Sequence, residues 1–310
     1  MSLDNVSKQT AEQPSAKRLF IVDGHAYAYR AFYAIRQLAS PVTGKPTNAI
    51  YGFIRMLGKM QAFLQPTHQM VVWDGGLASE RMALHPEYKT HRPAMPSLLE
   101  MQMDEIVRFL KAANIRSYHR DGIEADDWIA TLTKRAVRED FSVVIASSDK
   151  DFLQLIDANV GLLNPNDKEP KVWTVEDVRT KTGVEPSQIV DWLSLIGDTV
   201  DNIPGVPGIG PGTATKLLKQ FGSIEELYRR LDEVSSSRIQ AALKASEPLL
   251  KRNRDLIQLH DNLPDVLCCD DLAIAAPETQ LLLECYKEWG FKTLQQELER
   301  KLGPQQDSLL

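Results

Sequence analysis

The chain of 310 residues has only three cysteines, and no apolar run approaches the roughly 20 residues that a membrane-spanning helix needs. Its N-terminus is polar and lacks the apolar core of a signal peptide, which argues against export. The cysteines lie near the C-terminus, form no metal-ligand pattern and fit the reduced thiols of a cytoplasmic protein. They are Cys268, Cys269 and Cys285. The composition therefore predicts an ordinary cytoplasmic globular protein.

An excess of positive charge is also absent, because 36 Lys and Arg face 42 Asp and Glu, giving a net charge of -6. Nucleic-acid-binding proteins usually show a basic surface. However, nine of the acidic residues fall in the compact motifs described below. Without those nine, 33 acidic residues remain against the 36 basic ones. The remaining surface is then mildly basic and is permissive for nucleic acid.

Three short apolar runs end in aspartate: RLFIVDG at Asp23, HQMVVWDGG at Asp74 and DFSVVIASSDKD at Asp149 and Asp151. Such runs predict buried strands that end in turns. Helical patterns lie between them, and this alternation predicts a largely parallel sheet with helices on both faces. Because ligands bind at the carboxyl ends of parallel strands, these acids are expected at one edge of the sheet. The predicted helices cover residues 48–63, 98–113 and 124–138.

The coarse organisation follows from where these patterns begin and end. Residues 1–17 are polar and unpatterned and predict a disordered tail. Residues 18–175 form the predicted α/β domain. From residue 176 to 310 the chain is mostly helical, with a short apolar segment at 271–275 and a helical pattern over 278–302 that is expected to pack back on the first domain.

Five acidic motifs carry the candidate chemistry. Asp is common at helix caps and turns, so any one of these acids has a structural alternative. Nine clustered carboxylates, however, repel one another strongly unless cations neutralise them. Oxygen ligands without nearby His or Cys favour Mg²⁺ or Mn²⁺, and two such ions suit phosphodiester hydrolysis. The motifs are IVDG (Asp23), VVWDGG (Asp74), GIEADD (Glu124, Asp126, Asp127), SSDKD (Asp149, Asp151) and GDTVDN (Asp198, Asp201).

Two further strings contain candidate partners of a phosphate backbone. HPEYKTHRP, which would otherwise be an exposed charged loop, offers Lys89 and Arg92 to phosphate and the ring of Tyr88 to a base. Arg30 lies about two helical turns after Asp23 and can point back at the same phosphate.

The string GVPGIGPGTATKLL predicts a glycine-rich turn before a helix, whose exposed N–H groups form a sequence-independent phosphate clamp. A GxGxxG nucleotide site fits poorly because no strand is predicted before it, and a purely structural turn between helices is the other alternative. The clamp residues are Gly208, Gly210, Gly212, Lys216 and Lys219.

Taken together, IVDG, YGF, EYKTHRP, GIEADD, SSDKDF and GDTVDNIPGVPGIGPGTA resemble, in order and spacing, the 5′-nuclease family. The resemblance runs from about residue 19 to residue 302 and is specifically to the 5′→3′ exonuclease domain of bacterial DNA polymerase I and its stand-alone phage relatives. It implies a PIN-like α/β domain, a helical arch at about residues 80–100, and a helix–three-turn–helix element that grips duplex DNA. The implied reaction is two-metal hydrolysis at 5′ ends or 5′ flaps, in DNA replication and repair.

The resemblance also implies individual roles. The basic residues at the scissile phosphate match Arg30, Lys89 and Arg92, and the stacking residue matches Tyr88. The clamp resembles a site at which backbone carbonyls hold a monovalent cation, often K⁺. The first metal cluster matches Asp23, Asp74, Glu124, Asp126 and Asp127, and the second matches Asp149, Asp151, Asp198 and Asp201.

Two departures from the family pattern stand out. Trp73-Asp74-Gly75-Gly76 replaces the usual aromatic, Asp and small residue, and the chain stops at Leu310, where a polymerase I would continue. The expectation is a free-standing monomer that acts on flaps, nicks and RNA–DNA junctions, with a DNA polymerase as functional partner. The competing hypotheses are a PIN-type ribonuclease and a catalytically silent DNA-binding module.

Overall fold

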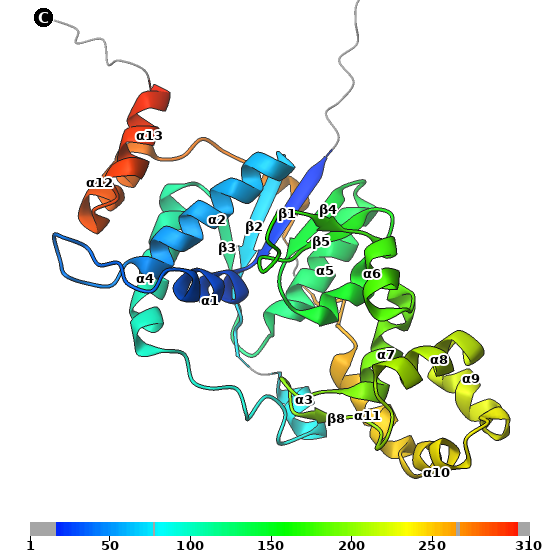
Figure 1. Cartoon of the computed structure of the whole chain (residues 1–310). Coiled ribbons are helices and arrows are strands. Elements are labelled where there is room, and N and C mark those ends of the chain that lie inside the picture. The colour runs from blue at the N-terminus through cyan, green and yellow to red at the C-terminus, as the bar shows by residue number, and fades with distance from the viewer. Residues whose placement is uncertain (1–16, 77, 265–266, 303–310) are drawn as a thin grey trace, which may run out of the picture.

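A six-stranded sheet forms the centre of the computed structural model, which describes residues 17–76, 78–264 and 267–302 (Figure 1). The strand order is β3-β2-β1-β4-β5-β6, and only β6 runs antiparallel to its neighbour. The predicted tail lies outside the described residues, apart from Lys17. The strands are β1 (Arg18–Asp23), β2 (His68–Val72), β3 (Arg116–Tyr118), β4 (Ser142–Ala146), β5 (Val160–Leu163) and β6 (Val172–Trp173).

The three strands predicted from apolar runs are confirmed and lie side by side at the centre of the sheet. β1 pairs in parallel with β2 on one side and with β4 on the other. Their carboxyl ends therefore meet at one edge, as the sequence predicted. The other three strands are short, which explains why no apolar run indicated them.

Both faces of the sheet are buried, because alternate residues of β1 enter different cores. Phe20 and Val22 pack under one helical layer, and Leu19 and Ile21 pack under the other. The first layer contains α1 (Gly24–Ala34), α2 (Asn48–Leu64) and α4 (Ser97–Ala112), and the second contains α5 (Ala125–Arg138) and the 3₁₀ helix η1 (Lys150–Leu155). The predicted helices are thus confirmed to within one residue at each end.

Residues beyond 175 are mostly helical, as predicted, and the helices α7 to α11 form the lobe at the lower right of Figure 1. The buried apolar side chains of residues 176–272 belong to the same core as the second face of the sheet. The division at residue 175 therefore stays a prediction. The elements are α6 (Val175–Thr182), η2 (Pro186–Gln188), α7 (Ile189–Ile196), β7 (Gly197–Asp198), β8 (Ile203–Pro204), α8 (Pro211–Phe221), α9 (Ile224–Arg229), η3 (Leu231–Glu233), α10 (Ser237–Ala245), α11 (Glu247–Ile257) and η4 (Cys269–Leu272).

The C-terminal helical pattern is two helices rather than one. α12 (Thr279–Trp289) ends at Gly290, whose φ of 76° stops the helix, and α13 (Lys292–Leu302) follows. Leu282 and Trp289 are buried in the core that covers the first face of the sheet. No described helix is long and apolar enough to cross a membrane.

The predicted arch is helical only in part. α3 (Ser79–Leu84) is followed by turns and irregular chain until α4 begins at Ser97. The prolines at 86, 93 and 96 explain this difference, because each lacks an N–H donor and disfavours helix in the residue before it.

Gly75 follows Asp74 at the carboxyl edge of the sheet, and a substitution there measures how tightly this edge is packed. A Cβ at this position would lie 1.7 Å from the backbone oxygen of Arg120. We expect Gly75→Ala to lower the free energy of unfolding by about 3 kcal/mol, the upper end for overpacking. The control Gly58→Ala, on an exposed position of α2 with nothing within 4 Å, should stabilise by roughly 0.5–1 kcal/mol. Chemical denaturation of both variants measures this, and equal stability of the two would contradict the packing argument.

Candidate active site

A cavity of about 640 Å³ opens at the carboxyl edge of the sheet. It is lined by six aspartates, and each of the five acidic motifs supplies at least one of them. The sequence prediction that these motifs converge is therefore confirmed for six of the nine acids. The six are Asp23, Asp74, Asp126, Asp149, Asp198 and Asp201.

Two of these aspartates are also helix caps. Asp23 accepts from the N–H of Ala26 at 3.0 Å, and its second oxygen accepts from the hydroxyl of Ser147 at 2.7 Å. Asp149 accepts from the N–H of Asp151 at 2.9 Å and begins η1. The alternative that these acids are helix caps is thus correct for Asp23 and Asp149. Capping fixes one oxygen of each carboxylate and aims the group along the edge of the sheet.

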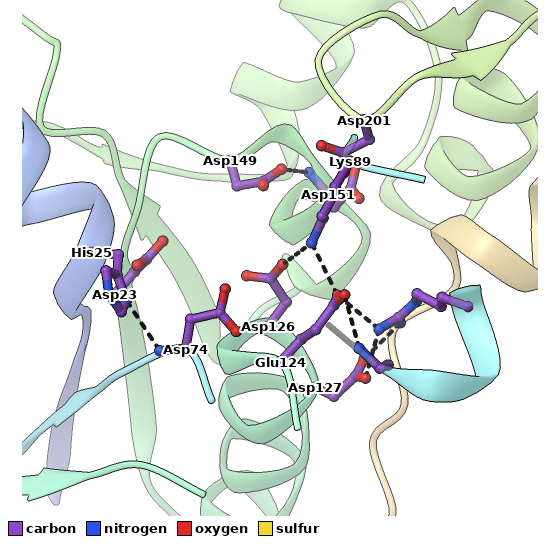
Figure 2. Close-up of polar contacts among 12 residues, drawn as sticks. Asp23, His25, Asp74, Lys89, Glu124, Asp126, Asp127, Asp149, Asp151 and Asp201 are labelled. Carbon is purple, nitrogen blue, oxygen red and sulfur yellow. Dashed lines mark hydrogen bonds and ion pairs between the residues drawn. The ribbon is translucent and has the colours of Figure 1, made fainter. Parts of the chain in front are cut away.

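The other three acids do not line the cavity. Asp151 is bonded through its N–H to the lining residue Asp149 and is 9% exposed, and its Oδ1 is buried without a hydrogen-bond partner among the described residues. Glu124 and Asp127 face the other way, towards the short helix α3 (Figure 2). The predicted set of nine therefore separates into six that line the cavity, one that is buried next to Asp149, and two that bind Arg81.

Arg81 accounts for the position of those two acids, and the sequence analysis missed it. Its guanidinium is 2% exposed and binds both oxygens of Asp127 at 2.8 Å and Glu124 at 3.0 Å. It also donates to the carbonyls of Leu256 and Gln258. Arg81 belongs to none of the acidic or basic motifs, and its only signal was an arginine on a short helix between an acid-tipped strand and the basic string.

Burial and mutual repulsion set the electrostatics of the cavity. The pKa values of Asp126 and Asp151 are raised well above the usual range, first by burial and then by the charge of Asp149. Burial also raises the pKa values of Asp23 and Asp201. A divalent cation would reverse these shifts by favouring the ionised carboxylates. The unpartnered oxygen of Asp151 and the all-oxygen donor set both fit such a cation.

Cations of the chain itself contact the carboxylates. Lys89 is 6% exposed, and its Nζ lies 3.0 Å from Glu124 and 3.9 Å from Asp126. Burial lowers the pKa of Lys89, but these carboxylates outweigh burial and raise it overall. Arg92 binds Asp201, and Lys150 lies 3.0 Å from Asp198. Over the described part of the chain, no three His, Cys, Asp or Glu side chains are arranged as a ready-made metal site.

The predicted phosphate and base contacts divide in the same way. Lys89 and Arg92 line the cavity, and so does Arg30, whose Nε donates to the carbonyl of Pro165 at 3.3 Å. Tyr88 does not: its ring is 3% exposed in the core, and its hydroxyl donates to Glu124. The expected stacking face of Tyr88 is therefore wrong for this arrangement, because no face of the ring is free.

The glycine-rich segment lies outside the cavity and is open to solvent. Gly208 has a φ of 82°, Gly210 is the N-cap of α8, and Gly210 and Gly212 have no atom within 4 Å of an added Cβ. Lys216 and Lys219 are exposed on α8. Contrary to expectation a strand, the two-residue β8, does precede the segment, although it is antiparallel to β7 and starts no βαβ unit.

Comparison with known proteins gives matches over nearly the whole chain. Residues 18–183 match the family model of the 5′-3′ exonuclease, N-terminal resolvase-like domain, and residues 184–280 match the 5′-3′ exonuclease, C-terminal SAM fold. A 5′-3′ exonuclease of Aquifex aeolicus (strain VF5) is 38% identical over 284 residues, covering 92% of this chain and 96% of that protein. DNA polymerase I of Bacillus caldotenax is also 38% identical, and the match covers 91% of this chain but 32% of the polymerase.

Solved structures share the fold at lower identity. The T5 5′-exonuclease with bound zinc has a TM-score of 0.65 at 21% identity, covering 92% of this chain and 98% of that one. The catalytic core of Rad2 in complex with a DNA substrate has a TM-score of 0.63 at 16% identity, covering 92% and 93%. The family models, the Aquifex relative and this shared fold agree, and the chain is a nuclease that belongs to the 5′-3′ exonuclease family.

Proposed function

We propose that this chain hydrolyses DNA phosphodiester bonds at 5′ ends and 5′ flaps, using two divalent ions that are Mg²⁺ or Mn²⁺. The observation that carries the proposal is the cavity lined by six aspartates, with basic arch residues on its wall. Oxygen-only ligands favour hard cations over zinc. When bound, two such ions would supply Lewis-acid activation of the attacking water and would neutralise charge on the phosphate.

The ligand roles follow from position in the site. Asp23, Asp74 and Asp126 face the cavity from strand ends and the start of α5, and they are the proposed core of the first cluster. Glu124 joins them only if it exchanges contacts with Lys89 and Arg81. The proposed second cluster contains Asp149, Asp151, Asp198 and Asp201.

Asp127 is assigned a different role from the one that the family resemblance implied. Both of its oxygens bind Arg81, and one also accepts from the N–H of His260 at 2.9 Å. These three hydrogen bonds use three of the about four lone pairs of a buried carboxylate that does not line the cavity. We therefore assign Asp127 to positioning Arg81, and through it the arch, rather than to direct ligation.

The basic residues would act on the substrate. Arg30, Lys89 and Arg92 line the same cavity as the aspartates, so a phosphate held there is within their reach. Lys89 and Arg92 now contact carboxylates. These contacts and divalent ions compete for the same oxygens, so binding of the ions frees both side chains for the phosphate.

The glycine-rich segment is the proposed grip on duplex DNA. The open backbone at Gly208, Gly210 and Gly212 permits close approach of a phosphate to the N-terminus of α8, with Lys216 and Lys219 beside it. The same proposal includes a K⁺ ion held by backbone carbonyls of this turn and action at RNA–DNA junctions. It also includes a monomer in the cytoplasm. Its last part is a DNA polymerase as functional partner. The match to the polymerase I of Bacillus caldotenax supports the last part.

The alternatives are less well supported. A silent DNA-binding module has no use for the acidic cavity, in which the polar groups of five motifs converge. A PIN-type ribonuclease would not need the helical region, whereas here residues 184–280 match the C-terminal domain of the nuclease family.

A substrate panel tests the proposed function. We expect Mg²⁺-dependent cleavage of a labelled 5′-flap DNA and of the 5′ ends of a duplex, both abolished by EDTA, and little cleavage of hairpin RNA. Asp126→Asn should lower flap cleavage by roughly 10²- to 10³-fold, because a metal ligand contributes several kcal/mol to the transition state. Flap binding in Ca²⁺ should persist. The control Asp121→Asn changes a side chain that is 97% exposed and should cleave normally. Cleavage of RNA alone would move the assignment to the ribonuclease.

Competition between Lys89 and divalent ions can be measured without substrate. Removing the ammonium in Lys89→Ala deletes a cation 3.0 Å from Glu124, so the carboxylates should bind Mn²⁺ about tenfold more tightly. Calorimetric titration of the DNA-free protein measures this, with Lys244→Ala on the exposed face of α10 as the control. Flap cleavage by Lys89→Ala should fall although its metal site is filled. Unchanged or weaker Mn²⁺ binding would contradict the competition.

The role of Asp127 predicts an effect on stability. Asp127→Ala leaves the buried guanidinium of Arg81 without its bidentate partner, which should cost about 3–5 kcal/mol of unfolding free energy. The double variant Arg81→Met with Asp127→Leu removes both charges and should recover most of that loss. Denaturant titration of the single and double variants measures the difference. If Asp127→Ala is as stable as the unmodified chain, the positioning role is wrong.

A further inference from the structure

His25 is a cavity residue that belongs to none of the predicted sets. It is the second residue of α1, directly after the Asp23 cap, and its half-buried ring lines the cavity. Figure 2 shows it beside Asp23 and joined to the backbone of Asp74 by a dashed line. Sequence reasoning passed over it because a lone histidine carries no spacing signal.

One hydrogen bond fixes which ring nitrogen carries the proton. The backbone N–H of Asp74 donates to Nδ1 of His25 at 3.1 Å. A nitrogen that accepts from an N–H has its lone pair engaged and bears no proton, so the proton of the neutral ring lies on Nε2. The ring therefore offers a donor, and not a metal-binding lone pair, at its outer nitrogen.

The ring is also held in place by packing. Its edge meets the Trp73 indole, with centroids 5.4 Å apart and planes at 89°. Trp73 is in turn fixed, because its N–H donates to Ser117 at 2.7 Å and its ring stacks on Phe53. A Cβ on Gly24 would lie 2.4 Å from Trp73, so α1 and the indole already touch. A donor anchored in this way loses little entropy when it binds a ligand.

The outer nitrogen of His25 differs from the other donors of the cavity. Lys89, Arg92 and Lys150 are each paired with a carboxylate, and Arg30 donates from Nε to the carbonyl of Pro165. Among the residues described, nothing hydrogen-bonds to Nε2 of His25, and this uncharged N–H needs no release from an acid before it meets an anion. We expect the acceptor for this N–H to be an oxygen atom of the bound substrate.

We propose that His25 is a substrate-binding residue that donates its Nε2–H to a non-bridging oxygen of one phosphate of the DNA strand at the cavity. This inference rests on the proposed function. Asp74 serves as both a metal ligand and, through its backbone N–H, the group that orients His25. One strand end thereby positions a metal ion and a phosphate relative to each other.

Paired amide substitutions separate this role from a purely structural one. His25→Asn keeps an acceptor near Nδ1 for the N–H of Asp74 but lacks the outer donor. His25→Gln places an amide N–H near Nε2 but loses the acceptor. Binding of 5′-flap DNA is measured in Ca²⁺, with His119→Asn, an exposed histidine, as the control. We expect His25→Asn to bind roughly tenfold more weakly, because it loses a hydrogen bond to a charged group, and His25→Gln to bind within about threefold of the unmodified chain.

A substrate change identifies the phosphate. Flap DNA with one neutral methylphosphonate is tested at each of the three links around the cleavage point. At the contacted link, the methylphosphonate should weaken binding by the unmodified chain about tenfold. It should weaken binding by His25→Asn little further, because two groups in contact do not contribute independently. Thermal unfolding of each variant accompanies the titrations, and the substrate series on the unmodified chain does not depend on how the variants fold.

The outcomes are distinguishable. If the unmodified chain binds no flap DNA, the proposed function fails and this inference fails with it. If it binds, but His25→Asn binds within twofold or loses affinity equally at every link, the phosphate contact alone is overturned. Normal binding by His25→Asn with weak binding by His25→Gln would instead show that His25 only positions Asp74, which also overturns the contact.

Discussion

Repulsion among carboxylates at one edge of a parallel sheet is the constraint on which the rest of the structure depends. Six aspartates share a single cavity, and burial together with neighbouring charge raises the pKa values of several of them. Charge of this density persists only where cations balance it. Lys89, Arg92 and Lys150 provide part of that balance from within the chain. The negative charge of the cavity therefore suits divalent ions. Lys89 and Arg92 of the arch occupy carboxylate oxygens that such ions would take over.

Arg81 extends this balance beyond the cavity. A buried guanidinium costs several kcal/mol in desolvation unless its donors are satisfied. Here carboxylates of α5 and carbonyls at the end of α11 satisfy it, so one side chain of α3 ties three parts of the fold together. Glu124 is shared between Arg81 and Lys89. A change in the contacts of Lys89 thus alters the electrostatics of Arg81 through one carboxylate.

Much of this could be predicted from the sequence, for identifiable reasons. Strands such as β1 are long, apolar and end in Asp23, so both the sheet and its acidic edge follow from local pattern. Contacts between distant segments leave no such pattern. The burial of Tyr88, the pairing of Asp127 with Arg81 and the bond from Asp74 to His25 all depend on how α3 and α1 meet other elements. Gly290 was visible as a glycine, but its positive φ and its close approach to Pro41, which an added Cβ would meet at 2.3 Å, depend on the tertiary structure.

The loop between β7 and β8 joins the two regions assigned to DNA. Its Asp201 carbonyl accepts from the N–H of Lys89, and its Asn202 carbonyl accepts from His85 at 2.9 Å. The side chain of Asn202 donates back to the carbonyl of Glu87. The glycine-rich turn begins only a few residues further along the chain. The bond between Lys89 and Asp201 joins two backbone groups, so side-chain rotation cannot release it. The arch can therefore leave the carboxylates only if this loop moves or its hydrogen bonds break. The same loop thus constrains both Lys89, which we propose to act on the substrate, and the proposed DNA grip.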